Sequence, residues 1–232
     1  MSAPILIRPL QPADYLPTLE AMRRFTASRG PDDADEIWLV EHPPVFTMGL
    51  AARPEHVLAP GDIPVLRTER GGQVTYHGPG QVVAYLMIDL RRRGLMVRDF
   101  VCRIEQAAIE LLAGYGVAAT RRSGAPGVYL AAAAGTGGDG AAAAGVAANV
   151  TAAAGAKIVS IGIKVSRGCS YHGVALNTAM DLEPFQRIDP CGYPGQAVTD
   201  LRQCIGKVDV AQVAARFGHC LSVQIESPAR GG

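Results

Sequence analysis

Hydrophobic residues recur along the chain in two patterns, one typical of strands and one typical of helices. A helix is predicted to begin near Val97 and to end at Gly114 or Gly116, because apolar residues there recur every three or four positions. A second helix is predicted over residues 208–221. The apolar stripe of the first helix comprises Phe100, Val101, Ile104, Ala108, Leu111 and Leu112. Short apolar runs bounded by turn residues predict strands at 5–7, 36–40, 81–90, 127–130, 157–166 and 173–177. Because strands and helices do not alternate strictly, the pattern predicts an α+β fold with a mixed β-sheet flanked by helices.

Residues 131–156 fit neither pattern. They are almost entirely Ala and Gly, with one charged residue, Asp139. Ala favours helix, but the repeated glycines interrupt every turn and no large side chain is present to pack in a core. We interpret the segment as a flexible loop insertion in a single catalytic domain spanning residues 1–232. A lid over a binding site is the alternative.

Composition narrows the classes of function. The 232 residues carry a formal net charge of +1, which argues against a surface for nucleic acid, and the basic run 91–93 is interpreted as a solvated strand end. The N-terminus lacks the pattern of a signal peptide, and no apolar run is long enough to span a membrane. Five cysteines without framework spacing suit a reducing compartment, so a cytoplasmic location is expected.

The segment RGGQVTYHGPGQ, residues 70–81, is rich in glycine. Such a loop can bring backbone amides close to a ligand, and the free N–H groups suit an anion or a carbonyl oxygen. The alternative is a tight turn that only leads into the strand at 81–90.

The segment KIVSIGIKVSRGCSYHGVALN, residues 157–177, begins with a lysine at the start of an apolar strand. If the surroundings draw the Lys157 side chain inside, desolvation lowers its pKa and lets it exchange protons. The alternative is a lysine exposed at the end of a strand.

The turn RIDPCGYPG, residues 187–195, holds Cys191 between prolines and glycines rather than in an apolar periodic segment. Pro190 fixes one backbone dihedral and Gly192 frees the next, so the turn is shaped and a ligand could reach the thiol. Shape alone does not make this cysteine catalytic.

Other cysteines and histidines are candidates of lower rank. Cys102, on the predicted helix, is interpreted as a core residue, whereas Cys169 rivals Cys191 because it stands three residues before His172. No set of ligands complete enough for zinc accompanies that pair, so no metal site is predicted. His77 and His172 are interpreted as pocket walls or hydrogen-bond donors, with a structural role as the alternative. The remaining pair, His42 and His56, is expected to matter only locally.

Taken in order and spacing, RGGQVTYHGPGQ, KIVSIGIKVSRGCSYHG, HGVALN and RIDPCGYPG closely resemble the bacterial lipoyl(octanoyl) transferases. The resemblance runs from EHPPVFTMG at residue 41 to DLRQCIG near residue 206, and the Ala/Gly segment is the one departure from it. It implies the fold of lipoate and biotin protein ligases. It also implies transfer of an octanoyl group from acyl carrier protein to a lysine of lipoyl domains, those of 2-oxoacid dehydrogenase complexes and the glycine cleavage H protein.

The resemblance further implies that Cys191 carries the acyl group as a thioester and that Lys157 lowers the pKa of that thiol. No resident cofactor is expected, since the donor is octanoyl-phosphopantetheine on the carrier protein. The acyl pocket implied by the resemblance is lined by Arg70, Gly71, Gly72, Gln73, Val74, Thr75, Tyr76, His77, Ser160, Ile161, Gly162, Gly173, Val174 and Ala175.

The residue types suit this chemistry, because a thiolate can be both acylated and deacylated and a lysine can manage the protons. Backbone amides near Gly71 and Gly72, or in the turn at 191, are the alternatives for stabilising the oxyanion. Two other functions stay open: an ATP-dependent lipoate ligase of the same fold, which would not need Cys191, and an acyl-binding protein without turnover.

Overall fold

The computed structural model describes residues 4–132, 153–189 and 195–228. Cys191 and residues 133–152 of the predicted insertion therefore lie outside the described residues.

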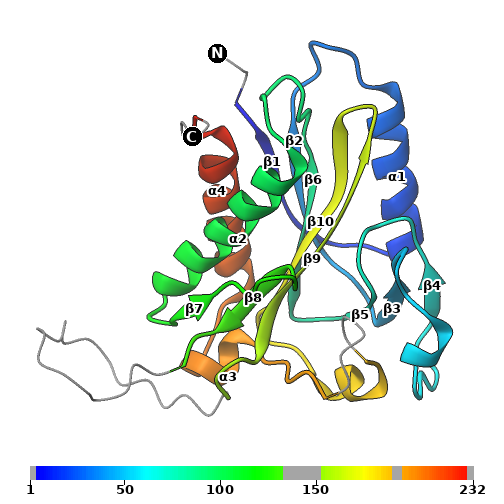
Figure 1. Cartoon of the computed structure of the whole chain (residues 1–232), viewed down its shortest axis with the longest axis vertical. Coiled ribbons are helices and arrows are strands. Elements are labelled where there is room, and N and C mark those ends of the chain that lie inside the picture. Colours follow the sequence, from blue (N-terminus) through cyan, green and yellow to red (C-terminus); the bar gives the residue numbers. More distant parts are fainter. Residues whose placement is uncertain (1–3, 133–152, 190–194, 229–232) are drawn as a thin grey trace, which may run out of the picture.

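A seven-stranded sheet forms the centre of the described chain, in the order β1-β2-β6-β10-β9-β8-β7. Strands β1 and β2 pair in parallel and the other neighbours are antiparallel, so the predicted mixed sheet is confirmed. The long β9–β10 hairpin crosses the middle of the molecule (Figure 1). The strands of this sheet are β1 (Leu6–Pro12), β2 (Glu36–Glu41), β6 (Gln81–Met87), β7 (Ala119–Thr120), β8 (Gly127–Leu130), β9 (Lys157–Ser166) and β10 (Cys169–Asn177).

A smaller sheet of three strands has the order β4-β3-β5, with β3 parallel to β4 and antiparallel to β5. The strands are β3 (Val45–Met48), β4 (Val65–Arg67) and β5 (Val74–His77). This sheet was not predicted, because its strands are too short for a periodic pattern to appear.

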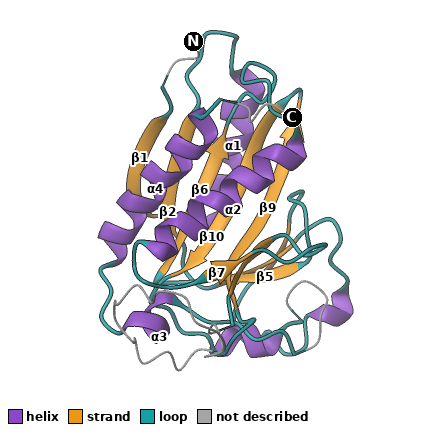
Figure 2. Ribbon diagram, turned by 60° about the vertical axis from the view of Figure 1, so that its left-hand side comes forward, coloured by secondary structure: helices purple, strands orange, loops and turns teal. Residues whose placement is uncertain are grey.

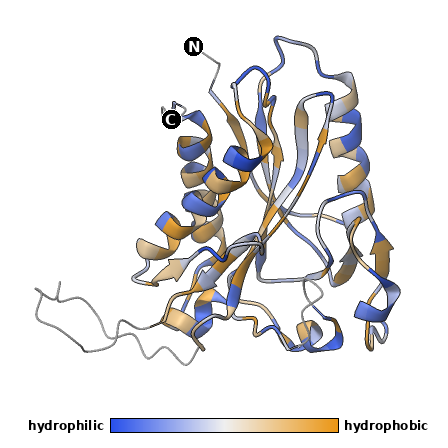
Figure 3. Cartoon of the chain, in the orientation of Figure 1, coloured by the Kyte–Doolittle hydropathy of each residue, from blue (hydrophilic) through white to orange (hydrophobic). Residues whose placement is uncertain are grey.

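Helices cover both faces of the large sheet. Helices α2 and α4 lie side by side on one face, while α1 and the small sheet lie on the other (Figures 1 and 2). Hydrophobic and hydrophilic residues alternate around these helices, as expected when one side of each is buried (Figure 3). The helices are α1 (Tyr15–Ser28), α2 (Val97–Ala113), α3 (Leu201–Ile205) and α4 (Val210–Glu226), with short 3₁₀ turns η1 (Pro54–His56) and η2 (Glu183–Arg187). No described helix combines the length and apolar character that a membrane crossing requires.

Alternate residues of the central strands point into two apolar layers, one on each face of the large sheet. In β6, Val82, Ala84 and Leu86 pack with α2 and α4, whereas Val83 and Tyr85 face α1. A strand buried on both faces reads as a continuous apolar run, which explains why β6 was recognised from the sequence. The end of β6 was predicted wrongly, since the strand stops at Met87 rather than at residue 90.

Helix α2 largely confirms the sequence pattern. It begins at Val97, and every residue of its predicted stripe except Val101 packs in the core. The Gly114 amide closes the end of the helix by donating to the Glu110 and Leu112 carbonyls. The interpretation of Cys102 as a core residue is wrong, because its side chain is exposed. Cys102 lies between Val101 and Arg103, off the buried stripe.

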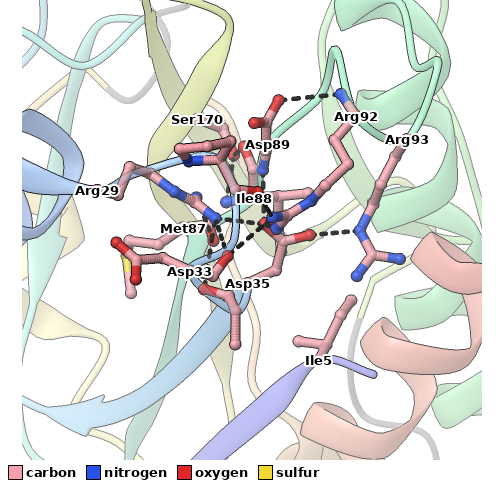
Figure 4. Close-up of polar contacts among 12 residues, drawn as sticks. Ile5, Arg29, Asp33, Asp35, Met87, Ile88, Asp89, Arg92, Arg93 and Ser170 are labelled. Carbon is pink, nitrogen blue, oxygen red and sulfur yellow. Dashed lines mark hydrogen bonds and ion pairs between the residues drawn. The ribbon is translucent and has the colours of Figure 1, made fainter. Parts of the chain in front are cut away.

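The interpretation of residues 91–93 as a solvated strand end is wrong for Arg92 and Arg93, although Arg91 is exposed. Arg92 and Arg93 converge with Arg29 on the buried carboxylate of Asp35, at distances of 2.7, 2.5 and 2.7 Å (Figure 4). Burial alone would raise the pKa of Asp35, but hydrogen bonds from the Asp89 amide and from the guanidinium groups lower it. The basic run therefore neutralises a buried acid and joins the turn after β6 to the start of β2.

Candidate active site

A narrow cavity of about 60 Å³ lies on the α1 side of the large sheet, between β6, β9 and β10 and the loop that precedes β5. Every described residue of the predicted acyl pocket lines it except Gly71 and Tyr76, and Lys157 lines it too. The Tyr76 side chain instead packs between Phe46 and Phe185 in a separate apolar cluster. The cavity is also lined by residues outside the implied pocket: Tyr15, Val83, Tyr85 and His172.

Arg70 fixes the glycine loop over the cavity. Its guanidinium is buried and donates to the backbone carbonyls of Thr47, Gly71 and Gln73, at 2.5, 2.9 and 2.7 Å. Five donors in a rigid fork suit such a role, because they can satisfy several carbonyl groups of one loop at once. Arg70 thus shapes the cavity wall through the backbone.

Two glycines let the loop lie directly on β9. The Gly71 amide donates to the Ile163 carbonyl at 3.0 Å. A Cβ atom on Gly162 would stand 2.9 Å from the Gly71 oxygen, closer than real Cβ atoms approach backbone, so a side chain there would push the loop away. Gly72 has a φ of +87°, which other residues rarely adopt. The glycines of the RGG and SIG segments therefore allow one close contact, that of the loop with β9.

His77 belongs to a hydrogen-bonded chain at the side of the cavity. Its Nδ1 lies 2.7 Å from the Gln81 side-chain oxygen and its Nε2 lies 3.3 Å from the Thr47 hydroxyl. The Gln81 amide donates in turn to Asn177, which donates to the Thr199 carbonyl. Burial lowers the pKa of His77 to about 3, so the ring is neutral, with Nδ1 as donor and Nε2 as acceptor. His77 is a cavity wall whose polar atoms are already used by the fold.

Lys157 is buried at the start of β9, with 3 % of its surface exposed. Its Nζ donates to the Pro126 carbonyl at 3.2 Å and lies 5.3 Å from the centre of the Tyr129 ring. A Cβ atom on Gly127 would stand 2.7 Å from the Lys157 Cε, so that glycine provides the space for the lysine. The alternative of a lysine exposed at a strand end is wrong.

The backbone of Lys157 is held by the segment that follows the Cys191 turn in the chain. The Lys157 amide donates to the Ala197 carbonyl at 2.8 Å, and the Thr199 amide donates to the Lys157 carbonyl at 3.0 Å. Through Thr199 the same segment accepts from Asn177 and so joins the chain of hydrogen bonds that ends at His77.

The structure separates Cys169 from the cavity. Cys169 is the first residue of β10 and pairs with Ser166, at the end of the hairpin away from Lys157. Burial raises the pKa of its thiol, which disfavours the reactive thiolate, and Cys169 does not line the cavity. The proposed partner His172 does line it, but residues three apart in a strand face opposite sides of the sheet.

His42 contributes more than the local role expected for it. Its Nδ1 donates to the Ala13 carbonyl and its Nε2 accepts from the Tyr85 hydroxyl, both at 2.6 Å. Burial lowers the pKa of His42, which favours the neutral ring. Tyr85 lies opposite Gly173, and its ring lines the cavity beside Tyr15. These aromatic residues were missed because Tyr15 comes from an unrecognised helix and Tyr85 from an uninterrupted apolar run.

Within the described ranges, no three His, Cys, Asp or Glu side chains gather in the way a metal ion would require. The polar side chains that line the cavity are instead one lysine, one arginine, two histidines, two tyrosines and the side chains of Gln73, Thr75 and Ser160. Such a set can position a carbonyl compound and move protons.

Comparisons with known proteins agree with this geometry. Residues 14–222 match the lipoyl protein ligase A/B catalytic domain family. The chain is 54% identical over 208 residues to a protein named octanoyltransferase from Pseudomonas putida (strain W619), covering 90% of this chain and 85% of that one. It is 52% identical over 217 residues to an octanoyltransferase of Pseudomonas entomophila (strain L48), covering 94% of this chain and 90% of the relative.

Solved structures share the fold at low sequence identity. A putative lipoate protein ligase from T. acidophilum with bound lipoic acid superposes with a TM-score of 0.67 at 15% identity, covering 97% of this chain and 86% of that one. The biotin protein ligase of Aquifex aeolicus, in complex with biotin and ATP, gives a TM-score of 0.54 at 9% identity, covering 96% of this chain and 70% of the ligase. The predicted fold class is therefore confirmed.

Proposed function

Since the chain belongs to the lipoyl protein ligase A/B catalytic domain family, we propose that it is an octanoyltransferase that acts in protein lipoylation. It takes an octanoyl group from the phosphopantetheine thioester of acyl carrier protein and passes it to a lysine of lipoyl domains. Cys191 carries the acyl group between the two half-reactions, and no resident cofactor takes part. The observation that carries this proposal is the buried lysine at the edge of a narrow, largely apolar cavity, on a chain more than half identical to a named octanoyltransferase.

The first half-reaction loads the enzyme. The Cys191 thiolate attacks the carbonyl carbon of the donor thioester, a new carbon–sulfur bond forms, and the bond to the phosphopantetheine sulfur breaks. The Lys157 ammonium gives its proton to the departing thiolate, which leaves as a thiol. An acyl-cysteine and a neutral lysine remain.

The second half-reaction unloads the enzyme. The amine of the acceptor lysine attacks the acyl-cysteine, an amide bond forms, and the Cys191 sulfur leaves as a thiolate. The neutral Lys157 takes the proton released by the attacking nitrogen, which restores the starting pair of ammonium and thiolate. One residue thus serves as acid and then as base.

The described contacts of Lys157 suit this role. Its acceptor is a carbonyl of Pro126 and its neighbour is the face of Tyr129, and both favour an ammonium without supplying a proton of their own. The apolar surfaces of Val83, Ile161 and Ala175 continue from there along the cavity and would cover an alkyl chain.

The ligase alternative has weaker support. Likeness to lipoate and biotin ligases is at 15% identity or less, which speaks for the fold, whereas the relatives above 50% identity are named octanoyltransferases. Cys191 in its Pro-Cys-Gly turn also has a use in thioester chemistry and none in adenylate chemistry.

The test is intact-mass analysis after incubation with octanoyl-acyl carrier protein. We expect an added octanoyl group on Cys191 that hydroxylamine removes, and transfer of that group to a lipoyl domain added next. Cys191→Ser should take up no hydroxylamine-sensitive group, and Cys102→Ser, at an exposed cysteine, is the matched control. Formation of an acyl-adenylate from octanoate and ATP without any adduct would contradict the proposal.

A further inference from the structure

Arg122 is an exposed residue near Lys157, in the loop of residues 121–126 that joins β7 to β8. Its guanidinium carbon lies 4.3 Å from the centre of the Tyr129 ring, and the Lys157 Nζ lies 5.3 Å from the same centre. Strands β8 and β9 lie side by side, and Tyr129 pairs with Lys157 across them (Figure 1). The exposed guanidinium and the buried ammonium therefore share one buried ring.

The loop that carries Arg122 also contacts the Lys157 ammonium directly. The Pro126 carbonyl accepts from the Lys157 Nζ at 3.2 Å, and the Ala125 carbonyl accepts from the Tyr129 hydroxyl at 3.1 Å. The position of the ammonium thus depends on where this loop lies against β8 and β9.

Arg122 joins the loop to two further segments of the chain. One guanidinium nitrogen donates to the Gln196 side-chain oxygen at 2.9 Å, and another donates to the Gly155 carbonyl at 3.3 Å. A Cβ atom on Gly155 would stand 3.3 Å from the guanidinium, and its φ of +80° also favours glycine at this position. Gly155 comes two residues before Lys157 in the sequence. Gln196 comes five residues after Cys191.

Gln196 completes this set of contacts. Its side-chain amide donates to the carbonyls of Gly155 and Ala197, at 3.3 and 2.9 Å. The Ala197 carbonyl also accepts from the Lys157 amide at 2.8 Å. Arg122 and Gln196 together hold three segments in contact: the β7–β8 loop, the start of β9 and the chain around Ala197.

The contacts of Arg122 differ from those of its neighbour in the loop. Among the described residues, Arg121 forms an ion pair with the Glu105 carboxylate at 3.1 Å, whereas Arg122 has no carboxylate within ion-pair distance. A planar guanidinium can stack on a ring and donate from several nitrogens at once, which an ammonium cannot do. The Arg122 side chain uses both properties to connect groups around Lys157.

We propose that Arg122 is a positioning residue for the acyl transfer, because it holds Lys157 in place against segment 195–199, which follows Cys191 in the chain. The inference rests on the proposed function. Arg122 does not line the cavity, and a guanidinium does not give up its proton, so Arg122 itself transfers none. A displacement of about 1 Å in a reacting group can cost about 10²-fold in rate.

The test measures kcat and KM for octanoyl transfer in variants of Arg122. Arg122→Ala should lower kcat about tenfold to hundredfold and leave KM for the donor within about threefold, since the cavity lining is unchanged. Arg122→Lys keeps the charge but not the planar fork, so it should restore little of kcat. The matched control is Arg216→Ala, at an exposed arginine of α4 that stacks on Tyr115 at the same 4.3 Å, with no expected change in kcat.

A double variant tests whether Arg122 acts through Lys157. In single-turnover acylation followed by intact mass, adding Arg122→Ala to Lys157→Ala should cost less than about twofold, because the residue that Arg122 positions is already gone. Gln196→Ala removes the partner of Arg122 and should give the same loss of kcat at constant KM. It decides if the Arg122 variant does not fold.

Two kinetic results would overturn the proposal. One is a raised KM with unchanged kcat in Arg122→Ala that Arg122→Lys reverses, which is the behaviour of a charge that attracts an acidic donor protein. The other is an equal loss from Arg122→Ala in wild type and in the Lys157→Ala background, which would make its effect independent of Lys157.

Amide hydrogen exchange separates this proposal from the proposed function. The Lys157 amide donates to the Ala197 carbonyl and the Thr199 amide donates to the Lys157 carbonyl, so both should exchange about fivefold faster in Arg122→Ala, while amides of β6 keep their rates. If the wild-type protein transfers no octanoyl group, the proposed function fails, and the exchange rates still support or contradict the role of Arg122. Unchanged exchange at both amides would contradict it.

Discussion

At one end of the cavity Lys157 donates to the Pro126 carbonyl and lies over Tyr129, whereas at the other end the ring nitrogens of His172 have no partner among the described residues. Both side chains are buried and both line the same space. A buried polar group that the fold satisfies can be held in place for chemistry. One that the fold leaves unsatisfied is a place for a ligand or water. The difference assigns the reaction to the Lys157 end and leaves the His172 end open to a polar ligand group or to water.

The largest expected effect comes from Lys157. We predict that Lys157→Ala lowers kcat/KM about 10²- to 10⁴-fold, equally for six-, eight- and ten-carbon donors, because loss of a general acid and base affects every chain alike. Lys157→Arg should lose most turnover too, since a guanidinium does not give up its proton. Steady-state kinetics with a donor series measures this. A loss confined to one chain length would mean that Lys157 selects the chain rather than moving protons.

The next effect concerns a buried charge outside the cavity. Asp35→Asn leaves three arginines without their carboxylate and should cost about 3–5 kcal/mol of unfolding free energy, measured by urea denaturation. The folded variant should keep the wild-type ratios of kcat/KM among six-, eight- and ten-carbon donors, because the cluster does not line the cavity.

The pH dependence of the stability follows from the direction in which the pKa of Asp35 shifts. The folded pKa is lowered, so the stabilisation is present above about pH 4, the ordinary value, and is lost as pH falls through the folded value. Below about pH 4, the free energy of unfolding should therefore fall faster in wild type than in Asp35→Asn. Parallel curves for the two proteins would contradict the contribution assigned to this carboxylate.

A smaller effect on stability is expected from His77, whose ring nitrogens are both hydrogen-bonded at the side of the cavity. His77→Leu strands the Gln81 oxygen and should cost about 1–3 kcal/mol of unfolding free energy. In wild type the folded ring has a pKa of about 3, so the unfolded state alone binds a proton below about pH 6.5 and stability falls as pH drops from there. This slope should be weaker in His77→Leu.

The smallest effect is expected at Gly162, between the two ends. Gly162→Ala places a Cβ atom 2.9 Å from the Gly71 oxygen, and the displaced loop should cost about 1 kcal/mol, or about fivefold in kcat/KM. Gly30→Ala is the matched control, since the nearest atom to its Cβ is 3.9 Å away. An effect as large as that of Lys157→Ala would mean that the loop itself carries part of the chemistry.

The sequence predicted the elements with the strongest periodicity. Strands β8 and β9 have the predicted bounds, and α2 starts at the predicted residue, because long apolar patterns and glycine stops are local signals. Helix α1 was missed, although its buried residues Tyr15, Leu19 and Met22 stand at helical spacing. Strand β10 begins at Cys169 rather than at the predicted residue 173.

The cavity could be predicted only in part. Resemblance supplied Lys157 and the glycine segments, and the structure adds their reason, the contact of Gly71 and Gly162. His172 was interpreted as a pocket wall and does line the cavity, but its contact with Tyr85 could not be predicted, because it depends on the pairing of β10 with β6. The charge cluster could not be predicted either, because Arg92 and Arg93 are distant from Asp35 in the sequence and a run of arginines gives no sign of a buried acid.

The coupling of Lys157 to Cys191 is tested most directly by the pH dependence of Cys191 alkylation with iodoacetamide. A free thiol has a pKa of about 8.5, and a nearby ammonium favours the thiolate, so wild type should titrate clearly below that value. Lys157→Ala should move back toward the free-thiol value, and Lys157→Arg should stay low while turnover is lost. Identical profiles for wild type and Lys157→Ala would show that the two side chains are not coupled, and would contradict the acyl-transfer mechanism.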